Sequence, residues 1–387
     1  MAAYDASDVA AQSTPGNSTE LKKFASDFHT EYLRENRFAA YMGGSKKSAV
    51  IVNHRELVGK GKEVSVPIVH QLRGGRKGLS PLVGAESQMY ADTMNVRPIY
   101  IRDAVTIRTD QEQKSFIDLL KARKHVLKGK AKDDLYVMML EAFRMIGVDP
   151  DLYDVETAVT ENILYENATG TQLDQWNTEN PYRVFYGADA ANRTAGNHAT
   201  SIAALGATDK VSATLLRRLK SEAQARNFAK GPTARSALHP VEVSGLNESF
   251  VVFMGTKEYN DAAKDEEIKE AYLHAARTGL SKNRIFQGGD CIYFDNLIIK
   301  KVPEMDGVNP SATVGRISFC GASAFARGEG DKLKMTKRSE DDYGVISGVG
   351  YQERYTVQKT MFKDKNVDEA SPPLAQYGVM DCFVTID

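Results

Sequence analysis

The sequence predicts an α+β protein with extended arms, and three observations support this fold class. Segments with helical and with strand periodicity alternate along the chain, without an internal repeat of roughly 20–50 residues. Residues 1–19 are polar and small, as in a flexible arm, before any apolar stripe begins. Two strand-like runs are separated by roughly 30 residues, a length that is uncommon inside a compact domain and is usually functional.

The composition is that of a folded protein with balanced charge. The 387 residues include 42% hydrophobic and 26% charged residues, enough for two or three subdomains with a buried core. Lys and Arg number 50 against 51 Asp and Glu, so any contact with nucleic acid must come from a local patch. Cys291, Cys320 and Cys382 are few and widely spaced, which favours small buried side chains over a disulfide framework.

The first amphipathic segment follows the polar arm. Leu21, Phe24, Phe28 and Tyr32 recur at helical spacing and predict a helix to about residue 34. Its apolar face can dock on its own domain or on a neighbouring molecule, and the sequence leaves both possibilities open.

Residues 50–108 predict β structure around a long excursion. Val64, Val66 and Ile68 alternate with other residues, and Pro67 places this strand at an edge or on a projection because proline cannot donate to a ladder. A second alternating run at 99–107 is expected to pair with it as an extended hairpin arm. Between them lies a basic, glycine-rich turn that contains Arg73, Arg76 and Lys77.

The strongest helical segment is 111–146. Gly129 is expected to interrupt it, with Asp133 capping a second helix. Its basic residues gather at helical spacing on one face, and this face is either a solvated surface or a surface that meets phosphates or an acidic neighbour. The residues that share this face are Lys121, His125, Lys128 and Lys132.

The remainder of the chain predicts mixed structure. Helices are expected at 211–226 and 259–277 from their apolar periodicity. Strands are expected at 250–254, 292–294, 297–300, 316–320, 354–359 and 378–386.

Signatures of catalysis or cofactor binding are missing from the sequence. The segment from Met42 to Ser48 lacks the first glycine of a phosphate-binding loop and follows a predicted helix rather than a strand. The seven histidines form no H-E-x-x-H motif and have no cysteine partners at zinc spacing. We therefore expect no catalytic residue, cofactor or metal, and no apolar run approaches the roughly 18 residues of a membrane span.

Several segments, taken in order, resemble tailed-bacteriophage major capsid proteins with the Hong Kong 97-type fold. The closest similarity is to the coat proteins of podoviruses that package a virion RNA polymerase. The resemblance covers residues 20–387, and its motifs are diffuse. The segments are Lys22-Lys23-Phe24 to Phe38-Ala39-Ala40-Tyr41-Met42-Gly43, Glu63-Val64-Ser65-Val66-Pro67 with Gly84-Ala85-Glu86, Phe250 to Met254 before a helix and Ile285-Phe286-Gln287-Gly288-Gly289, and Tyr377-Gly378-Val379-Met380.

The resemblance implies an organisation of the chain in five parts. These are an N-terminal arm at 1–45, an extended loop with flanking peripheral strands at 46–108, a peripheral domain with a long spine helix at 109–150, an axial domain at 151–325, and a return to the peripheral sheet with C-terminal strands at 326–387.

The resemblance also implies a function without enzymatic activity. Such a chain assembles with itself in the host cytoplasm into hexamers and pentamers that form the icosahedral shell of the virion around double-stranded DNA. Portal, scaffolding or decoration proteins are implied partners, DNA contact would be weak and non-specific, and no membrane is involved. Inter-subunit contacts are expected at Phe24, Phe28, Tyr32, Arg73, Arg76 and Lys77, and a lumen-facing or DNA-facing surface at Lys121, Lys124, Lys128 and Lys132.

Two other functions fit the residues without the resemblance. The chain could be a nucleic-acid-binding protein that uses the basic cluster at 121–132, or an enzyme whose site is assembled from dispersed residues. Particle size in solution separates a shell from either small species.

Overall fold

A computed structural model describes residues 36–56, 62–73, 77–79, 82–84, 86–108, 119–149, 161–227, 229–243, 246–277, 291–341 and 346–386. These residues fall into two compact units. The first unit contains Tyr100–Val137 and Asp331–Arg354, and the second contains Arg37–Ile99, Met138–Gly330 and the chain from Tyr355 onward.

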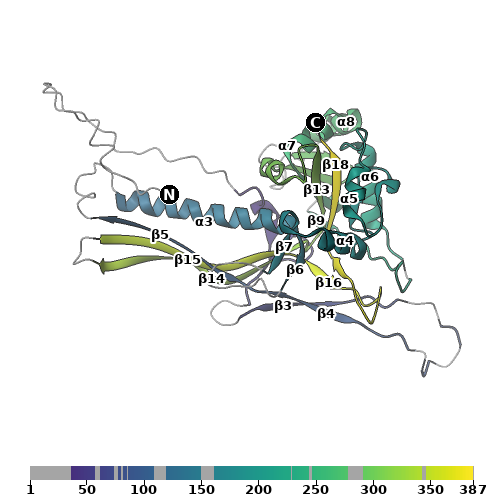
Figure 1. The fold of residues 1–387 in the computed structure, drawn as a ribbon, viewed down its shortest axis with the longest axis horizontal. Helices are drawn as coiled ribbons and strands as arrows, with labels where there is room; N and C mark the ends of the chain where they lie inside the picture. Colours follow the sequence, from purple (N-terminus) through teal and green to yellow (C-terminus); the bar gives the residue numbers. More distant parts are fainter. Residues whose placement is uncertain are drawn as a thin grey trace. The chain divides into compact units, whose positions relative to one another are not determined.

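Strands account for much of the described chain (Figure 1). They are β1 (Met42–Gly43), β2 (Ile51–His54), β3 (Val64–Val69), β4 (Ala91–Val96), β5 (Ile99–Arg108), β6 (Met145–Val148), β7 (Asn162–Leu164), β8 (Val184–Tyr186), β9 (Val241–Val243), β10 (Leu246–Met254), β11 (Cys291–Phe294), β12 (Leu297–Lys301), β13 (Val314–Cys320), β14 (Phe325–Asp341), β15 (Ile346–Lys359), β16 (Met361–Lys363), β17 (Leu374–Gln376) and β18 (Val379–Thr385).

The helices vary widely in length. The α-helices are α3 (Leu119–Arg144), α4 (Gly170–Glu179), α5 (His198–Ala203), α6 (Ala213–Gln224), α7 (Thr256–Lys264) and α8 (Glu266–Arg277). Short 3-10 helices are η1 (Ala39–Tyr41), η3 (Tyr165–Asn167), η4 (Ala190–Asn192) and η7 (Pro303–Val308).

The core of the second unit is a mixed seven-stranded sheet. Its strand order is β11-β12-β10-β13-β18-β8, with β9 paired to β10. β10 runs parallel to β12 with Phe250 opposite Leu297, and antiparallel to β13 with Val252 opposite Phe319. All seven residues of β13 are buried, as expected for a strand that is covered on both faces.

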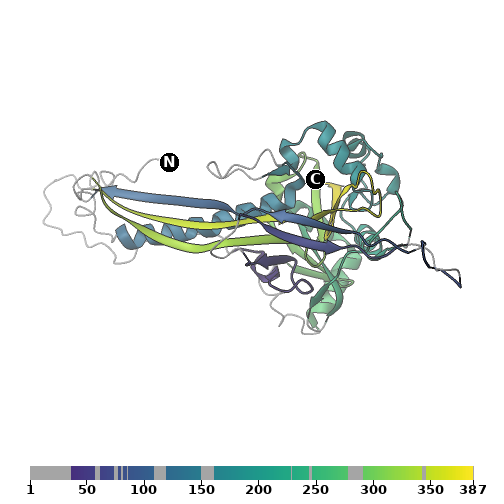
Figure 2. The same cartoon turned by 90° about the horizontal axis from the view of Figure 1, so that it is seen from below.

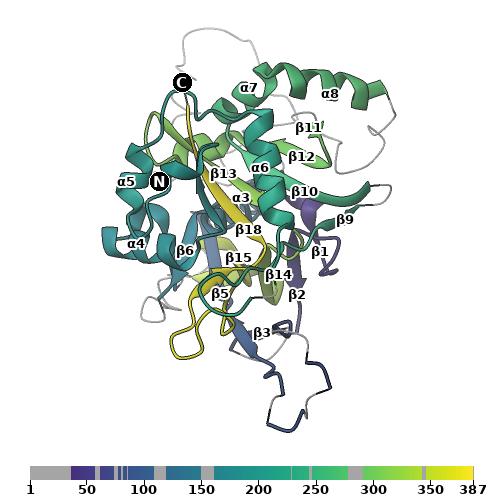
Figure 3. The ribbon, with the colours of Figure 1, turned by 90° about the vertical axis from the view of Figure 1, so that its right-hand side faces the viewer.

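Helices cover both faces of this sheet. On one face, Leu215, Leu216 and Leu219 of α6 pack with strand residues and with Ala262 of α7 and Ile268 of α8. Figure 3 shows these three helices beside the sheet. On the other face, α4 contributes Trp176 and the strands contribute Val184, Tyr186, Val314 and Phe383. Neighbouring residues of β18 therefore enter different clusters, because successive side chains of a strand point to opposite faces.

A second sheet has the strand order β1-β2-β14-β15-β5. The elements α3, β5, β14 and β15 contribute residues to both units. Within the first unit, Leu127 and Ala131 of α3 pack against Val349 and Tyr351 of β15. Figures 1 and 2 show α3 running alongside these long strands.

The predicted interruption at Gly129 is wrong, because α3 is one helix over all of its described length. A glycine inside a helix costs about 1 kcal/mol relative to alanine. Leu127 and Ala131, which flank it, are buried against the strands of the first unit, and their packing offsets that cost.

The predicted partner of the strand at 64–69 is also wrong. β3 pairs antiparallel with β4, from Val64 opposite Val96 to Val69 opposite Ala91, whereas β5 lies at the edge of the five-stranded sheet. β4 carries only two buried apolar residues, Met94 and Val96, so its strand signal is weak. The hairpin exists, but its second strand begins earlier in the chain than the pattern predicted.

The segment expected as one helix at 259–277 consists of α7 and α8, separated at Asp265. The carboxylate of Asp265 accepts hydrogen bonds from the backbone N–H groups of Glu267 and Ile268, at 3.0 and 3.3 Å, and so caps α8. The predicted helix α6 and the predicted strands β10 to β13 and β18 are confirmed within one to a few residues. The strand predicted at 354–359 is the end of β15, which begins at Ile346. The predicted helix at 21–34 lies outside the described residues.

The cysteine side chains lie largely inside the protein, as the sequence predicted. Cys320 and Cys382 are buried, Cys291 is half-buried, and none of the three forms a disulfide bond within the described residues. Burial raises the pKa of Cys382 to about 12, with Arg218 opposing the shift, so this thiol is protonated at neutral pH. Among the described residues, no helix is long and apolar enough to cross a membrane.

Candidate functional site

The β3–β4 hairpin is fixed firmly at its base. Val64, Val66, Met94 and Val96 point to one face and form a buried cluster with Ala326 and Phe362. Alternate residues of β3 are exposed, so the hairpin has one packed face and one solvent face.

An ion-pair group holds the same end of the hairpin. The guanidinium of Arg97 donates to the carboxylate of Glu63 at 2.7 Å and to that of Glu161 at 3.3 Å. Burial raises the pKa of Glu161, and Arg97 opposes this shift. These contacts orient the root of the hairpin within the second unit.

The outer part of the hairpin exposes apolar side chains. Each of them is at least 58% exposed, and the set is Val69, Leu72, Leu79, Leu82, Val83 and Met89. Single exposed apolar residues are ordinary, but six within one projecting segment are typical of a surface that is covered by another molecule. We refer to these six residues as the hairpin tip set.

The predicted basic contact residues of this segment lie in different surroundings. The side chain of Arg73 is buried in its own chain, 3.5 Å from the carbonyl oxygen of Ala229 and 4.0 Å from the carboxylate of Asp364. Lys77 is exposed, and Arg76 lies outside the described residues. Arg73 therefore has partners within the subunit, and of the described pair only Lys77 is open to an outside acidic group.

The lysines of α3 lie away from its packed face. Lys124, Lys128 and Lys132 are exposed, whereas Leu127 and Ala131 are buried. Lys121 lies within the helix, but its side chain is not among those described. Lys130 is not part of this surface, since its ammonium pairs with Asp134 at 2.5 Å.

The chain after the predicted N-terminal helix is anchored by aromatic packing. Phe38 is fully buried, with its ring centroid 5.1 Å from that of Phe143 and 5.4 Å from that of Phe253. Tyr41 contacts the same Phe253 ring at 5.2 Å. Phe24, Phe28 and Tyr32, the predicted contact residues of the arm, lie outside the described residues.

Sequence reasoning missed a buried ion group formed by Arg316 of β13, Asp381 of β18 and Lys359 of β15. Asp381 of β18 accepts hydrogen bonds from Arg316 at 3.2 Å and from Lys359 at 2.8 Å. Lys359 and Asp381 have no exposed area at all. The sequence feature that could have revealed this group is the single charged residue in the apolar run Met380-Asp381-Cys382.

A buried histidine was also missed. His198 lies between two tyrosines, with Tyr165 Oη 2.8 Å from Nε2 and Tyr186 Oη 2.7 Å from Nδ1. Burial, and next the charge of Arg316, lower its pKa to about 4. The imidazole is therefore neutral at physiological pH and belongs to the aromatic core around Phe383.

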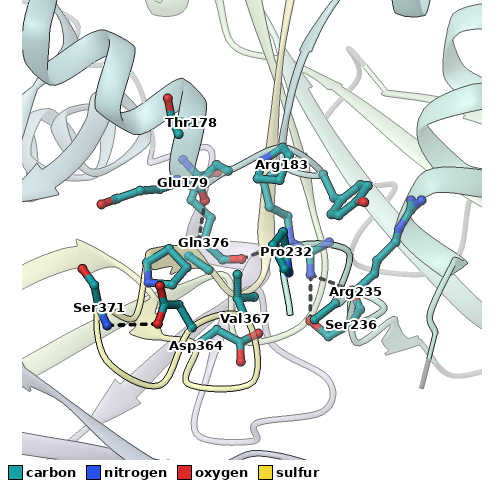
Figure 4. Close-up of a pocket in the computed structure, with 17 residues that line it drawn as sticks. Thr178, Glu179, Arg183, Pro232, Arg235, Ser236, Asp364, Val367, Ser371 and Gln376 are labelled. Atoms are coloured by element: carbon teal, nitrogen blue, oxygen red, sulfur yellow. Dashed lines mark hydrogen bonds between the residues drawn. The ribbon is translucent and has the colours of Figure 1, made fainter. Parts of the chain in front are cut away.

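Within the described ranges, no three His, Cys, Asp or Glu side chains gather as a metal site would require. A cavity with a volume of about 360 Å³ is lined by residues that include Arg183, Arg235, Asp364 and Gln376 (Figure 4).

The fold and these surfaces define a Hong Kong 97-type shell subunit, with a long helix against long strands and a projecting hairpin that exposes apolar residues. The chain matches the phage capsid protein family over residues 12–363 and belongs to that family. It is a bacteriophage major capsid protein, a structural subunit of the icosahedral virion shell.

Solved capsids share the fold. The cyanophage Pam1 capsid subunit is 21% identical with a TM-score of 0.78, and the alignment covers 97% of this chain and 99% of that one. The capsid of Ralstonia phage GP4 is 22% identical, with a TM-score of 0.67 and coverage of 97% and 98%. The head of Helicobacter pylori bacteriophage KHP40 gives 11% identity, a TM-score of 0.61 and coverage of 97% and 96%. Comparison with curated proteins finds no match.

Proposed function

We propose that this subunit assembles into hexamers and pentamers that close around double-stranded DNA, together with portal and scaffolding or decoration proteins. We assign residues 1–45 to the arm, 46–108 to the extended loop and its flanking strands, 109–150 to the spine region, 151–325 to the axial domain and 326–387 to the returning strands. The chain is further assigned to the coat proteins of podoviruses that package a virion RNA polymerase, which the four segments of the sequence resemblance support.

The hairpin tip set is the observation that carries this proposal. Its six apolar side chains project from a hairpin whose base is fixed by a buried cluster and by Arg97. Burying one such side chain contributes roughly 1.5–3 kcal/mol before ordering costs are subtracted. A projection of this kind adds contact area with a neighbour without enlarging the core, and a shell repeats the contact in every copy.

The arm and the basic turn are assigned to the same role. Phe24, Phe28 and Tyr32 would pack on a neighbouring subunit, with Phe38 anchoring the chain behind them. Lys77, together with Arg76, would meet acidic groups of an adjacent copy. Such exposed pairs contribute about 0–1 kcal/mol each, so their effect depends on repetition around the shell.

Replacement of four residues of the hairpin tip set tests the proposal. The variant Leu79→Ser, Leu82→Ser, Val83→Ser, Met89→Ser should change the unfolding free energy of the subunit by less than about 0.5 kcal/mol per site, because these side chains are exposed. Its critical concentration for assembly should rise at least roughly tenfold, which sedimentation velocity measures.

Val148→Ser is the matched control, since Val148 is an exposed apolar residue of β6 outside the hairpin. It should assemble as the wild type does. Normal shells formed by the four-site variant would contradict the proposed role of the hairpin tip.

The α3 lysines are proposed to face the packaged DNA. Lys124→Gln, Lys128→Gln, Lys132→Gln should leave shell formation intact and reduce DNA retention modestly, with an effect that shrinks as salt rises, because screening acts within about 8 Å at physiological ionic strength. Retention of DNA by purified particles across a salt series is the measurement. The control replaces Lys332, Lys334 and Lys337 of β14, which are also exposed. Failure of the α3 variant to assemble would place its lysines in a subunit interface instead.

A further inference from the structure

The cavity of about 360 Å³ lies within the second unit. It is bounded by the end of α4, by the loop around Pro232 and by the connection from β16 to β17 (Figure 4). Arg183 enters it from the chain that follows α4, and Ser236 and Gln376 lie beside it. Nothing in the shell proposal uses this cavity.

Arg183 is a buried guanidinium whose hydrogen-bond partners are neutral. The side chain is only 6% exposed. Its Nε donates to the carbonyl oxygen of Gln376 at 3.1 Å, and its Nη2 donates to the carbonyl oxygen of Ser236 at 2.9 Å. Its Nη1 finds no acceptor among the described residues. No carboxylate of the described chain forms an ion pair with it within 4.0 Å.

The carboxylates that line the cavity already have partners. Asp364 accepts a hydrogen bond from the backbone N–H of Asn366 and lies 4.0 Å from Arg73 Nη2. Asp368 accepts hydrogen bonds from the backbone of two residues that follow it, at 2.9 and 3.2 Å. Glu179 accepts a hydrogen bond from Gln175 at 2.9 Å. These acidic groups therefore leave Arg183 without a directly bonded counter-charge.

A second guanidinium makes the cavity more positive near Arg183. Arg235 pairs with Glu222 and lies over the ring of Tyr182 at 4.8 Å, while its Nε has no partner among the described residues. Burial, and then repulsion from Arg235, lower the pKa of Arg183 to about 10. The charge of Asp364 opposes this shift without bonding to the guanidinium. The group is still cationic at neutral pH, and a buried cation without a directly bonded anion is costly.

We propose that this cavity binds a carboxylate, and that the carboxylate belongs to an acidic side chain of a second copy of this chain in the shell. The unpartnered Nη1 of Arg183 matches the acceptor-only chemistry of a carboxylate. An adjoining cavity of about 330 Å³ shares Arg235, Ser236, Asp364, Ala375 and Gln376 with the first, so the combined groove accommodates a peptide segment rather than a lone ion. In a shell, the polypeptide at highest local concentration is another copy.

The test compares Arg183→Met with Arg217→Met. Arg217 is an exposed arginine that already pairs with Glu267, so its loss is the matched removal of one positive charge. The Arg183 variant should raise the critical concentration for assembly at least roughly tenfold over the control. Acetate should raise the wild-type critical concentration relative to chloride at equal ionic strength, and inorganic phosphate should do so no more than acetate does.

A density map of the wild-type shell provides a test that needs no variant. It should show a carboxylate of a neighbouring copy within about 3.2 Å of Arg183 Nη1. Water alone, or a small buffer anion alone, at that atom would overturn the proposal, as would equal critical concentrations for the two variants. This inference rests on the proposed shell assembly. If the wild type forms normal particles in the same assay but no carboxylate binds in the cavity, the inference fails while the proposed function stands.

Discussion

Replacing Asp381 by asparagine is expected to destabilise the subunit by about 3–5 kcal/mol, because it leaves two cations buried without their anion. The carboxylate has no exposed area. It accepts hydrogen bonds from Arg316, Lys359, Ser318 and Gln376, at 3.2, 2.8, 3.1 and 3.1 Å. Burial alone would raise the pKa of Asp381, but the charges of Arg316 and Lys359 outweigh it and hold the pKa at about 2.

Lys359→Met is the informative comparison for that substitution. It removes a cation whose pKa burial lowers to about 8, and it leaves Asp381 paired with Arg316. The expected loss is therefore well below that of Asp381→Asn, because an intact buried pair of opposite charges remains. Urea unfolding of the unassembled subunit measures both. Equal losses would mean that packing, rather than charge balance, sets the stability of this group.

Glu258→Gln is expected to stabilise the subunit by up to about 3 kcal/mol at pH 8 and to have little effect below pH 4.5. Glu258 of α7 is fully buried, and Asn309 donates to its Oε1 at 3.0 Å. A Cβ placed on Gly255 would lie 2.5 Å from Oε2 and 2.2 Å from Oδ1 of Asp306, so two carboxyl groups converge here. Burial, with Asp306 adding to it, raises the pKa of Glu258 to about 7.

The direction of the pH dependence follows from that shift. The folded subunit keeps a proton on Glu258 up to about pH 7, whereas the unfolded chain releases it near 4.5. Stability from this group is therefore complete below pH 4.5 and is lost as the pH rises to 7. Glutamine resembles the protonated form and removes this loss. Glu266→Gln, at an exposed acidic residue of α8, is the control and should leave the profile unchanged.

His198 changes the stability of the subunit with pH in the opposite direction. Its pKa of about 4 lies below its ordinary value of 6.5, so its contribution to stability is present above pH 6.5 and is lost as the pH falls towards 4. Between about pH 4.5 and 6.5 the two groups offset each other in the wild type. Glu258→Gln should therefore reveal a stability that rises with pH across this window. Parallel profiles for wild type and variant would show that Glu258 is ionised in the folded subunit.

Elements with a strong local pattern were predictable from the sequence. The continuous apolar run at 250–254 became β10, and the periodicity at 211–226 became α6. β14 was missed, because its charged residues and its glycines at 328 and 330 break any alternation. It pairs on one side with the distant β2, with Phe325 opposite Ile51, and on the other side with β15, the next strand along the chain. Pairing with these strands, rather than local propensity, thus determines β14.

The functional surfaces were predictable only in part. The exposure of Lys124, Lys128 and Lys132 follows from helical spacing, which also buries Leu127. The burial of Arg73 could not be foreseen, because its partner Asp364 lies nearly 300 residues away and a glycine-rich basic turn gives no sign of it. Contact between these surfaces and a neighbouring subunit stays a prediction, because such a contact involves a second copy of the chain.

The position of β18 has a consequence for synthesis. β18 lies between β13 and β8, and it pairs with β8 through Asp381 opposite Val184. Roughly 200 residues separate these partners, so at about 5–20 residues per second a ribosome adds β18 some 10–40 seconds after β8. During that interval β8 lacks its neighbour, as does the edge of β13 once that strand has been synthesised, and the nascent chain exposes apolar strand surface. We expect this interval to be the period in which a chaperone that binds unfolded chains engages the subunit, before any shell contact can form.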